Sequence, residues 1–283
     1  MKRAAIAIAV LSMCAWTLAQ DQKQTPTAPS GQAAAAPQGK RAPAAKTQPE
    51  YDAYRAAVQS TDGAAAEKAA SDFAAKFPDS ELRVELYKFA MHNYQSNPDK
   101  LLEMAQKALA IDPDDPEALV TASQVLAERT RDTDLDRDQK LAQAKKDAER
   151  ALVTVDTDVP APNATLTPEK VDQFKRFIRS EAYAILGSLA SNAKNYSEAE
   201  TDLRKSVDAF PEQVDPVAVL RLAIALDMQN KYPDALKYAN QAVDLTKDHP
   251  ESPAGKAARS EQDRLTRLSS GSAPGQNTTP QKN

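Results

Sequence analysis

The chain has 283 residues, of which 36 are basic and 40 acidic, giving a net charge of −4. A mildly acidic chain is poorly suited to nucleic acid or to an anionic membrane surface, so we expect no nucleic-acid partner. Between the two terminal segments, glycine occurs only at positions 63, 187 and 255, which favours an α-rich fold over an all-β fold.

Residues 1–19 have the pattern of a secretory signal peptide. Lys2 and Arg3 precede an apolar run, and Ala19 ends a small-residue cleavage site. The run is shorter than the ~20 residues that a membrane-spanning helix needs. We therefore expect export, to the periplasm or outside the cell, and membrane contact only if this segment is retained. Lipidation at Cys14 is the alternative, although Met13 replaces the small residue that such signals favour.

Residues 20–49 consist largely of Gln, Ala, Pro, Thr and Lys and contain no large apolar residue. Such a segment cannot bury enough surface to fold, so we expect a disordered linker there and a similar tail at 269–283. The folded region is then 50–268. Cleavage after residue 19 would remove the only cysteine, so the exported chain must be stable without disulfides.

The first half of the folded region contains three segments with the spacing of paired helices. Residues 51–78 form a weak, alanine-rich pair, and residues 81–113 form a second pair that ends in Ala-Leu-Ala-Ile-Asp-Pro. A third pair starts at Pro116 and extends to residue 156, with alanines repeating along its second helix. These spacings predict consecutive helical hairpins.

A charged insertion lies between residues 129 and 140. Its aspartates alternate, at positions 132, 134, 136 and 138, as they do at the start of a calcium-binding loop. However, Arg137 stands where the loop needs Gly, and Gln143 stands where it needs a bidentate Glu. We expect a solvated, self-paired charged loop and no metal site. His92 and His249 have no second ligand nearby, which argues against zinc.

A second insertion, at residues 156–180, is rich in proline. It ends in Thr167-Pro168-Glu169, a cap followed by a first-turn proline. This order predicts a helix that begins at Pro168 and continues into Tyr183, longer than the other first helices.

Residues 183–211 contain a spacing of aromatic, aliphatic and small residues that recurs 36 residues later. The first copy contains Tyr183, Leu186, Gly187, Tyr196, Ala199, Leu203 and Pro211, and the second contains Val219, Leu222, Ala223, Tyr232, Ala235 and Ala239. The 183–211 unit resembles a tetratricopeptide repeat (TPR), with Leu186-Gly187 as its Leu-Gly pair, Tyr196 at the start of the second helix and Ala199 at the small site. This resemblance implies that Gly187 and Ala199 face each other within one hairpin.

The resemblance implies an all-α fold, a right-handed solenoid of helical hairpins. About five TPR-like units would fill 50–268, which exceeds the three needed to close a core. The last helix, 253–268, would form a cap with Arg264 and Arg267 facing solvent. An ordinary bundle of alanine-rich helices is the alternative.

In the TPR family the first helix of each pair lines a concave groove that binds a peptide or protein segment. Transferring those positions gives a candidate groove of Glu117, Thr121, Gln124, Glu128, Glu181, Ile185, Ser188, Asn192, Val217, Arg221, Ile224 and Met228. Arg221 is the only basic residue of this set, and we expect it either to meet a ligand carboxylate or to pair with Asp227 or Glu181. The mixture of aliphatic and polar groups suits an extended or helical segment.

The sequence contains no Gly-x-Ser-x-Gly motif, no phosphate-binding glycine loop and no nucleophilic cysteine in the folded region. We assign no catalytic residue, cofactor or metal ligand, and we expect a non-catalytic scaffold that binds a protein or peptide. The alternative is a structural envelope assembly factor that acts through its convex face, its insertions or self-association. An enzyme of unknown type is a third hypothesis.

Overall fold

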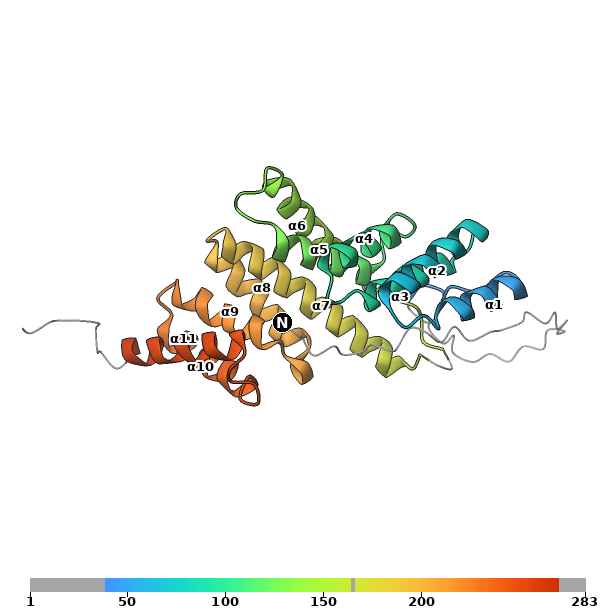
Figure 1. Cartoon of the computed structure of the whole chain (residues 1–283). Helices are drawn as coiled ribbons and strands as arrows, with labels where there is room; N and C mark the ends of the chain where they lie inside the picture. The colour runs from blue at the N-terminus through green and yellow to red at the C-terminus, as the bar shows by residue number, and fades with distance from the viewer. Residues whose placement is uncertain (1–38, 164–165, 270–283) are drawn as a thin grey trace, which may run out of the picture. The chain divides into compact units, whose positions relative to one another are not determined.

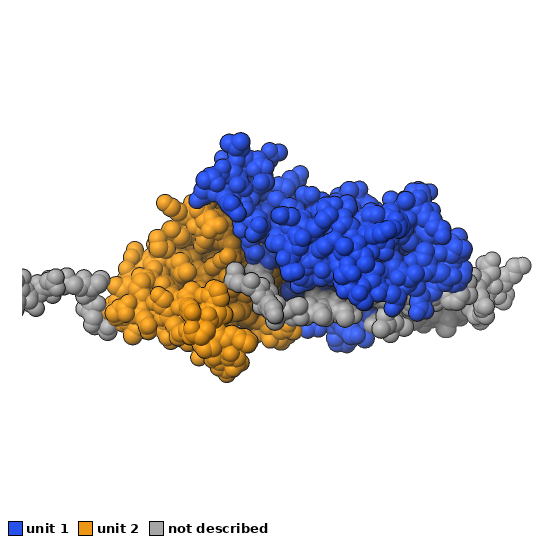
Figure 2. Space-filling view, viewed as in Figure 1, with its two compact units in different colours: residues 1–178 blue, residues 179–283 orange. Residues whose placement is uncertain are grey.

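The computed structural model describes residues 39–163 and 166–269. The signal peptide expected at 1–19, the linker as far as residue 38 and the tail from residue 270 lie outside the described residues. Within the described part, the chain forms eleven α-helices, one short 3-10 helix and no strand (Figure 1). It divides into two compact units, residues 1–178 (unit 1) and residues 179–283 (unit 2), which Figure 2 distinguishes by colour.

Helices follow one another with short connections in both units. Unit 1 contains α1 (Gln48–Ala57), α2 (Gly63–Lys76), α3 (Leu82–Asn93), α4 (Pro98–Leu109), α5 (Pro116–Arg129), α6 (Arg137–Thr154) and the first part of α7 (Pro168–Asn192). Unit 2 contains the rest of α7, α8 (Tyr196–Ala209), the 3-10 helix η1 (Pro211–Gln213), α9 (Pro216–Asp227), α10 (Tyr232–Leu245) and α11 (Pro253–Ser269). Each helix from α2 to α5 packs on the next, as does each helix from α8 to α10. The expected all-α fold of consecutively packed helices, a helical solenoid, is confirmed.

Capping residues explain where many of the helices begin. Thr47, Asp62, Asn97 and Asp115 each accept a hydrogen bond from the backbone N–H three residues further on. Proline occupies the first or second position of α1, α4, α5, α9 and α10, where its missing N–H has no consequence. The long helix predicted from Pro168 is also confirmed, since α7 runs for 25 residues.

Alanine stripes on the second helices allow neighbouring helices to approach closely. Completely buried alanines occur at positions 144, 148 and 151 of α6 and at 235, 239 and 242 of α10. Larger side chains from adjacent helices fill the space beside such stripes, among them Leu222 and Leu226 in unit 2. Each unit therefore has its own close-packed core, which needs no disulfide.

The partner of Gly187 differs from the expectation. A Cβ added at Gly187 would lie 2.6 Å from Leu203 Cγ and 3.1 Å from the Leu203 backbone nitrogen. The nearest atoms thus belong to Leu203, one turn beyond Ala199, which is itself buried among other side chains. The requirement for a small residue at Gly187 stands, but its cause is a leucine packed against the helix backbone.

The N-terminal boundary of the folded region also differs from the expectation. Residues 39–47, which the sequence places in the linker, make hydrogen bonds and ion pairs to unit 1, and α1 begins at Gln48. Their bonding partners are charged and backbone groups, and composition alone does not reveal such partners.

Candidate binding faces

The four candidate groove residues of α5 lie in unit 1 and differ in exposure. Glu117 is buried, Thr121 and Gln124 are half-buried, and Glu128 is exposed. Gln124 Nε2 donates a hydrogen bond to Glu128 Oε1 at 3.2 Å. The outer end of this face, toward the C-terminus of α5, is polar. Its inner end, at Glu117 near the N-terminus of α5, belongs to a cluster of buried charges.

This buried charge cluster joins α3 to the start of α5. Lys88 Nζ lies 2.9 Å from Asp115 Oδ2, 3.1 Å from Glu85 Oε1 and 3.7 Å from Glu117 Oε2. His92 Nε2 lies 2.6 Å from Glu117 Oε1. The side chains of Lys88 and the three carboxylates are all less than a tenth exposed, whereas the His92 side chain is 35% exposed. Unit 1 thus holds three carboxylates around one lysine, and His92 contacts one of them, Glu117.

The cluster changes the acidity of its members. Burial opposes ionisation of Glu117, but the neighbouring His92 and Lys88 outweigh it and lower the Glu117 pKa to about 2. Burial also opposes the charged form of Lys88, yet three carboxylates hold its pKa well above the usual value. The pKa of Glu85 is raised because burial dominates over its attraction to Lys88. The His92 pKa is raised in spite of burial, because Glu117 stabilises the imidazolium.

The sequence does not reveal this cluster. Glu85 and Lys88 are three residues apart on a helix, a spacing that is common on solvated faces. The available signal was Asp115-Pro116-Glu117, a capping residue and a first-turn acid that begin α5 opposite Lys88. Asp115 uses Oδ1 to accept from the Ala118 backbone and Oδ2 to meet Lys88, so it fixes both the start of α5 and its ion pair.

In unit 2, the candidate residues of α7 lie beside those of α9. Ile185 and Ser188 are buried, Glu181 is half-buried and Asn192 is exposed. Ser188 Oγ donates to the Ala184 carbonyl at 2.6 Å and accepts from Arg221 Nη1 at 2.7 Å. The structure therefore brings Ser188 and Arg221 together, a contact that sequence spacing alone did not give.

The α9 helix has one buried face and one partly open face. Its buried face carries Val219, Leu222, Ala223 and Leu226. On the other face, Val217 and Arg221 are half-buried, Ile224 is 38% exposed and Met228 is 51% exposed. Asp227, which precedes Met228, forms an ion pair with Arg264 and so connects α9 to α11. Arg264 was expected to face solvent, but it is engaged in this ion pair. Unit 2 thus presents two large apolar side chains four residues apart, following a positioned guanidinium.

A hollow of about 490 Å³ lies elsewhere in unit 1 and is lined by residues of α4, α5 and α6. Leu109, Leu119, Ala122 and Leu126 supply its apolar part, and charged residues including Asp114, Asp147 and Arg150 surround it. Arg150 of α6 forms an ion pair with Asp114, in the segment that follows α4, with 2.6 Å between Arg150 Nη2 and Asp114 Oδ1. None of these residues belongs to the candidate groove.

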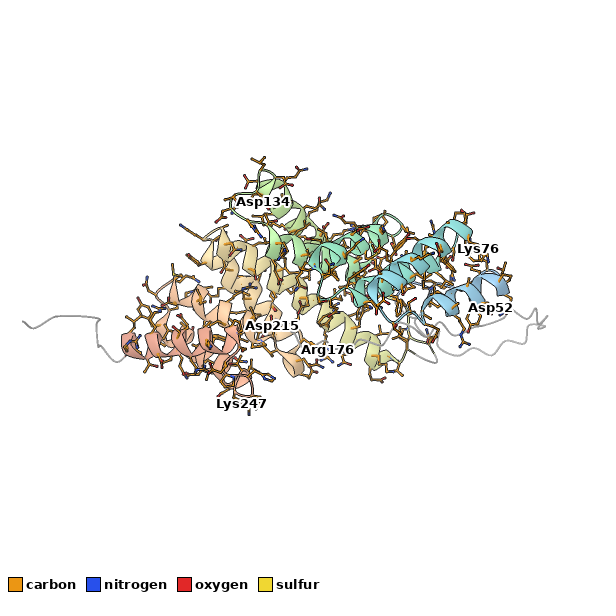
Figure 3. All side chains as sticks on the ribbon, viewed as in Figure 1. Asp52, Lys76, Asp134, Arg176, Asp215 and Lys247 are labelled. Carbon is orange, nitrogen blue, oxygen red and sulfur yellow. The ribbon has the colours of Figure 1, made fainter. Side chains whose placement is uncertain are left out.

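The charged insertion forms the loop before α6, where Figure 3 labels Asp134. Arg137 pairs with Asp132 and Asp138, and Lys140 pairs with Asp134 and Asp136. The expectation of a self-paired loop is confirmed. Leu135 within it is completely exposed.

The described residues offer neither a cluster of metal ligands nor a membrane-spanning helix. They contain no group of three or more His, Cys, Asp or Glu side chains placed to hold a metal ion. None of the helices in 39–163 and 166–269 is both long and apolar enough to cross a bilayer.

Comparison with models of known protein families finds no match, and comparison with curated proteins finds no significant match. The all-α fold is shown by the helices and by their packing on one another.

Proposed function

We propose that this protein is an exported, non-catalytic, TPR-like scaffold that binds a peptide or protein segment on the α9 face of unit 2. The observation that supports this most directly is the pair Ile224 and Met228. Both are large, apolar and exposed on a first helix, at a spacing that places them on one side of it. Burying such side chains against a ligand is favourable, while leaving them in water contributes nothing to folding.

The neighbouring polar groups define the chemistry of the ligand. Ser188 holds the Arg221 guanidinium at a fixed position one turn before Ile224. A segment with an aliphatic or aromatic side chain would cover Ile224 and Met228, and its carboxylate would meet Arg221. Charge-assisted hydrogen bonds of this kind strengthen when apolar neighbours exclude water.

The proposal is tested with variants of the tagged full-length protein. Each variant is purified from the native envelope, and the partners that co-purify with it are identified and quantified. We expect the double variant Arg221→Ala/Ile224→Ser and the single variant Met228→Gln to lose partners that the unmodified protein retains. Leu245→Ser is the matched control, because Leu245 is 44% exposed on α10 rather than on α9. Circular dichroism should show equal helicity in all variants. Undiminished capture by the double variant would exclude the α9 face as the binding site.

A second candidate is a structural envelope assembly factor that acts through other surfaces, as the hollow lined by α4, α5 and α6 and the exposed Leu135 suggest. An apolar hollow with a charged surround can accept one side chain of a partner. In that case Leu135→Ser or Leu109→Ser would reduce partner capture, and the α9 variants would not. The same co-purification therefore separates the two functions.

Export is tested by the mass of the protein recovered from the envelope. The mature chain should begin at or near Gln20 and carry no lipid, since residues 1–19 have the signal-peptide pattern. It should also show tyrosine fluorescence alone, because Trp16 is the only tryptophan. A mass that includes Met1 would contradict cleavage, and acyl chains would indicate a lipoprotein.

A further inference from the structure

Residues 39–47, here called the N-terminal strap, run across the turns that follow the second helices of unit 1. The turn after α2 contributes Asp79 and the turn after α4 contributes Asp112. The segment after α6 contributes Asp158 and the backbone near Val159. One short stretch of chain therefore contacts every second helix connection of unit 1, those after α2, α4 and α6.

Side-chain charge provides most of the contacts of the strap. Arg41 Nη2 donates to both carboxylate oxygens of Glu81, at 2.6 and 2.7 Å, and Lys46 Nζ donates to the Asp79 carbonyl at 2.7 Å. Lys40 Nζ lies 2.5 Å from Asp112 Oδ2 and 3.5 Å from Asp158 Oδ1. Lys40 and Arg41 thus pair with carboxylates at the turn edge of the unit, whereas Lys46 is bonded to a backbone carbonyl.

Two backbone hydrogen bonds fix the outer end of the strap. Lys40 N–H donates to the Val159 carbonyl at 3.0 Å, and Ala161 N–H donates to the Lys40 carbonyl at 2.8 Å. Gly39 precedes this bridge with a φ of +142°, and a Cβ there would lie 2.7 Å from the Val159 oxygen. Glycine is therefore required for the bridge to close.

The strap has little apolar attachment to unit 1. Its sequence contains no apolar residue larger than alanine or proline, and of these Ala45 packs at the edge of the core. The side chains of Lys40 and Arg41 remain 43% and 68% exposed. Ion pairs between exposed groups contribute little each and are weakened by salt.

We propose that residues 39–45 of the strap are a detachable latch, which closes the turn edge of unit 1 through Lys40 and Arg41 and opens while the helices stay folded. Lys46 and Thr47 stay in place, because both are bonded to Glu50 at the start of α1. The latch is distinct from the proposed ligand face, since the hydrogen bonds and ion pairs named above join residues of unit 1. When it opens, the carboxylates of Asp112, Asp158 and Glu81, which are 21%, 21% and 43% exposed in the closed form, lose their paired cations.

Hydrogen exchange of the full-length protein measures this opening at the Ala161 amide. Pro160 and Pro162 have no N–H, so a proteolytic fragment covering residues 159–163 reports mainly on Ala161 and Asn163. Asn163 N–H is bonded to the Leu166 carbonyl and serves as an internal reference. We expect Ala161 and Lys40 to be protected together, and to exchange far faster than core amides of α3 and α5.

Salt and one substitution should open the latch selectively. Raising NaCl to about 1 M, where the Debye length is about 3 Å, should accelerate Ala161 exchange by about tenfold. Gly39→Ala should have a similar or larger effect at low salt, whereas Gly31→Ala, the same change in a part of the chain outside the described residues, should have none.

Three results would overturn the proposal. An unprotected Ala161 amide in the unmodified protein would mean that the bridge does not form. Exchange of Ala161 only together with the core helices would make the strap an integral part of unit 1. Equal protection in Gly39→Ala and in the unmodified protein would mean that the bridge does not hold the strap.

Discussion

The first helices α5 and α9 present opposite kinds of surface, although the repeat pattern assigns them the same role. The inner end of α5 is filled by carboxylates that are already paired with Lys88 and His92 of α3. The corresponding face of α9 carries Ile224 and Met228 in contact with water, and its one guanidinium is held by Ser188 of α7. One face is closed by the protein's own charges, and the other exposes two large apolar side chains.

This difference shows that a repeat pattern specifies the backbone and core of a helix pair but leaves the first-helix face variable. The buried alanines and leucines recur in both units because close packing requires them. The outward positions obey no such requirement. Stability measurements should therefore find the largest effects in the charge cluster between α3 and α5, and the smallest at the open end of α9.

The largest effect is expected for Lys88→Met. The substitution preserves most of the side-chain volume and removes the cation shared by Glu85, Asp115 and Glu117. Removing one partner of a buried ion pair typically costs about 3–5 kcal/mol, because the remaining charges stay buried without compensation. Urea unfolding monitored by circular dichroism measures the free energy of unfolding.

The matched control is Lys68→Met, in an exposed i,i+4 pair with Asp72 on α2. Its free energy of unfolding should change by less than about 1 kcal/mol. If Lys88→Met were as stable as this control, the cluster would be solvated rather than buried.

The next largest effect is expected for Gly187→Leu in unit 2. Any side chain at this position must displace Leu203, whose Cγ would lie 2.6 Å from the new Cβ. Overpacking of this kind typically costs about 1–3 kcal/mol, and a lower melting temperature would report it. Combining it with Leu203→Ala should recover part of the loss, whereas Ala33→Leu, outside the described residues, should change nothing. Failure of Leu203→Ala to recover any stability would contradict the assigned contact.

A smaller effect is expected from the titration of His92. The folded-state pKa of His92 is raised above 6.5 by Glu117, so the stabilising contribution of its charge is complete below pH 6.5. The contribution is lost as the pH rises through the folded-state pKa. A single proton limits the slope to about 1.4 kcal/mol per pH unit, and the partial exposure of the ring reduces it further.

This direction of change is tested by measuring the free energy of unfolding in denaturant at pH values from about 5.5 to 8.5, a range that includes the ordinary histidine pKa. His92→Gln should flatten the dependence. A protein that becomes more stable as the pH rises through this range would refute the assigned role of His92.

The sequence predicts the helices better than it predicts the surfaces they form. Helical spacing, capping residues and first-turn prolines gave α7 and the start of α8 at Tyr196, because these signals act within a few residues. The partner of Gly187, the Lys88 cluster and the strap depend on residues brought together from distant positions. A lysine on a helix has the same local sequence whether it faces water or three carboxylates, so tertiary packing alone decides between the two.

The smallest stability effect is expected at the open end of α9. Met228→Gln preserves length and flexibility at a residue that is 51% exposed and caps the helix rather than lying within it. Surface changes of this kind usually alter the free energy of unfolding by no more than about 0.5 kcal/mol. Under the proposed function, the same substitution should weaken ligand binding, because it places a polar amide where the ligand's apolar side chain would pack. Stability and partner capture measured on the same preparation would therefore diverge. A large loss of stability in Met228→Gln would show instead that Met228 supports the fold, and that the α9 face is no more open than the α5 face.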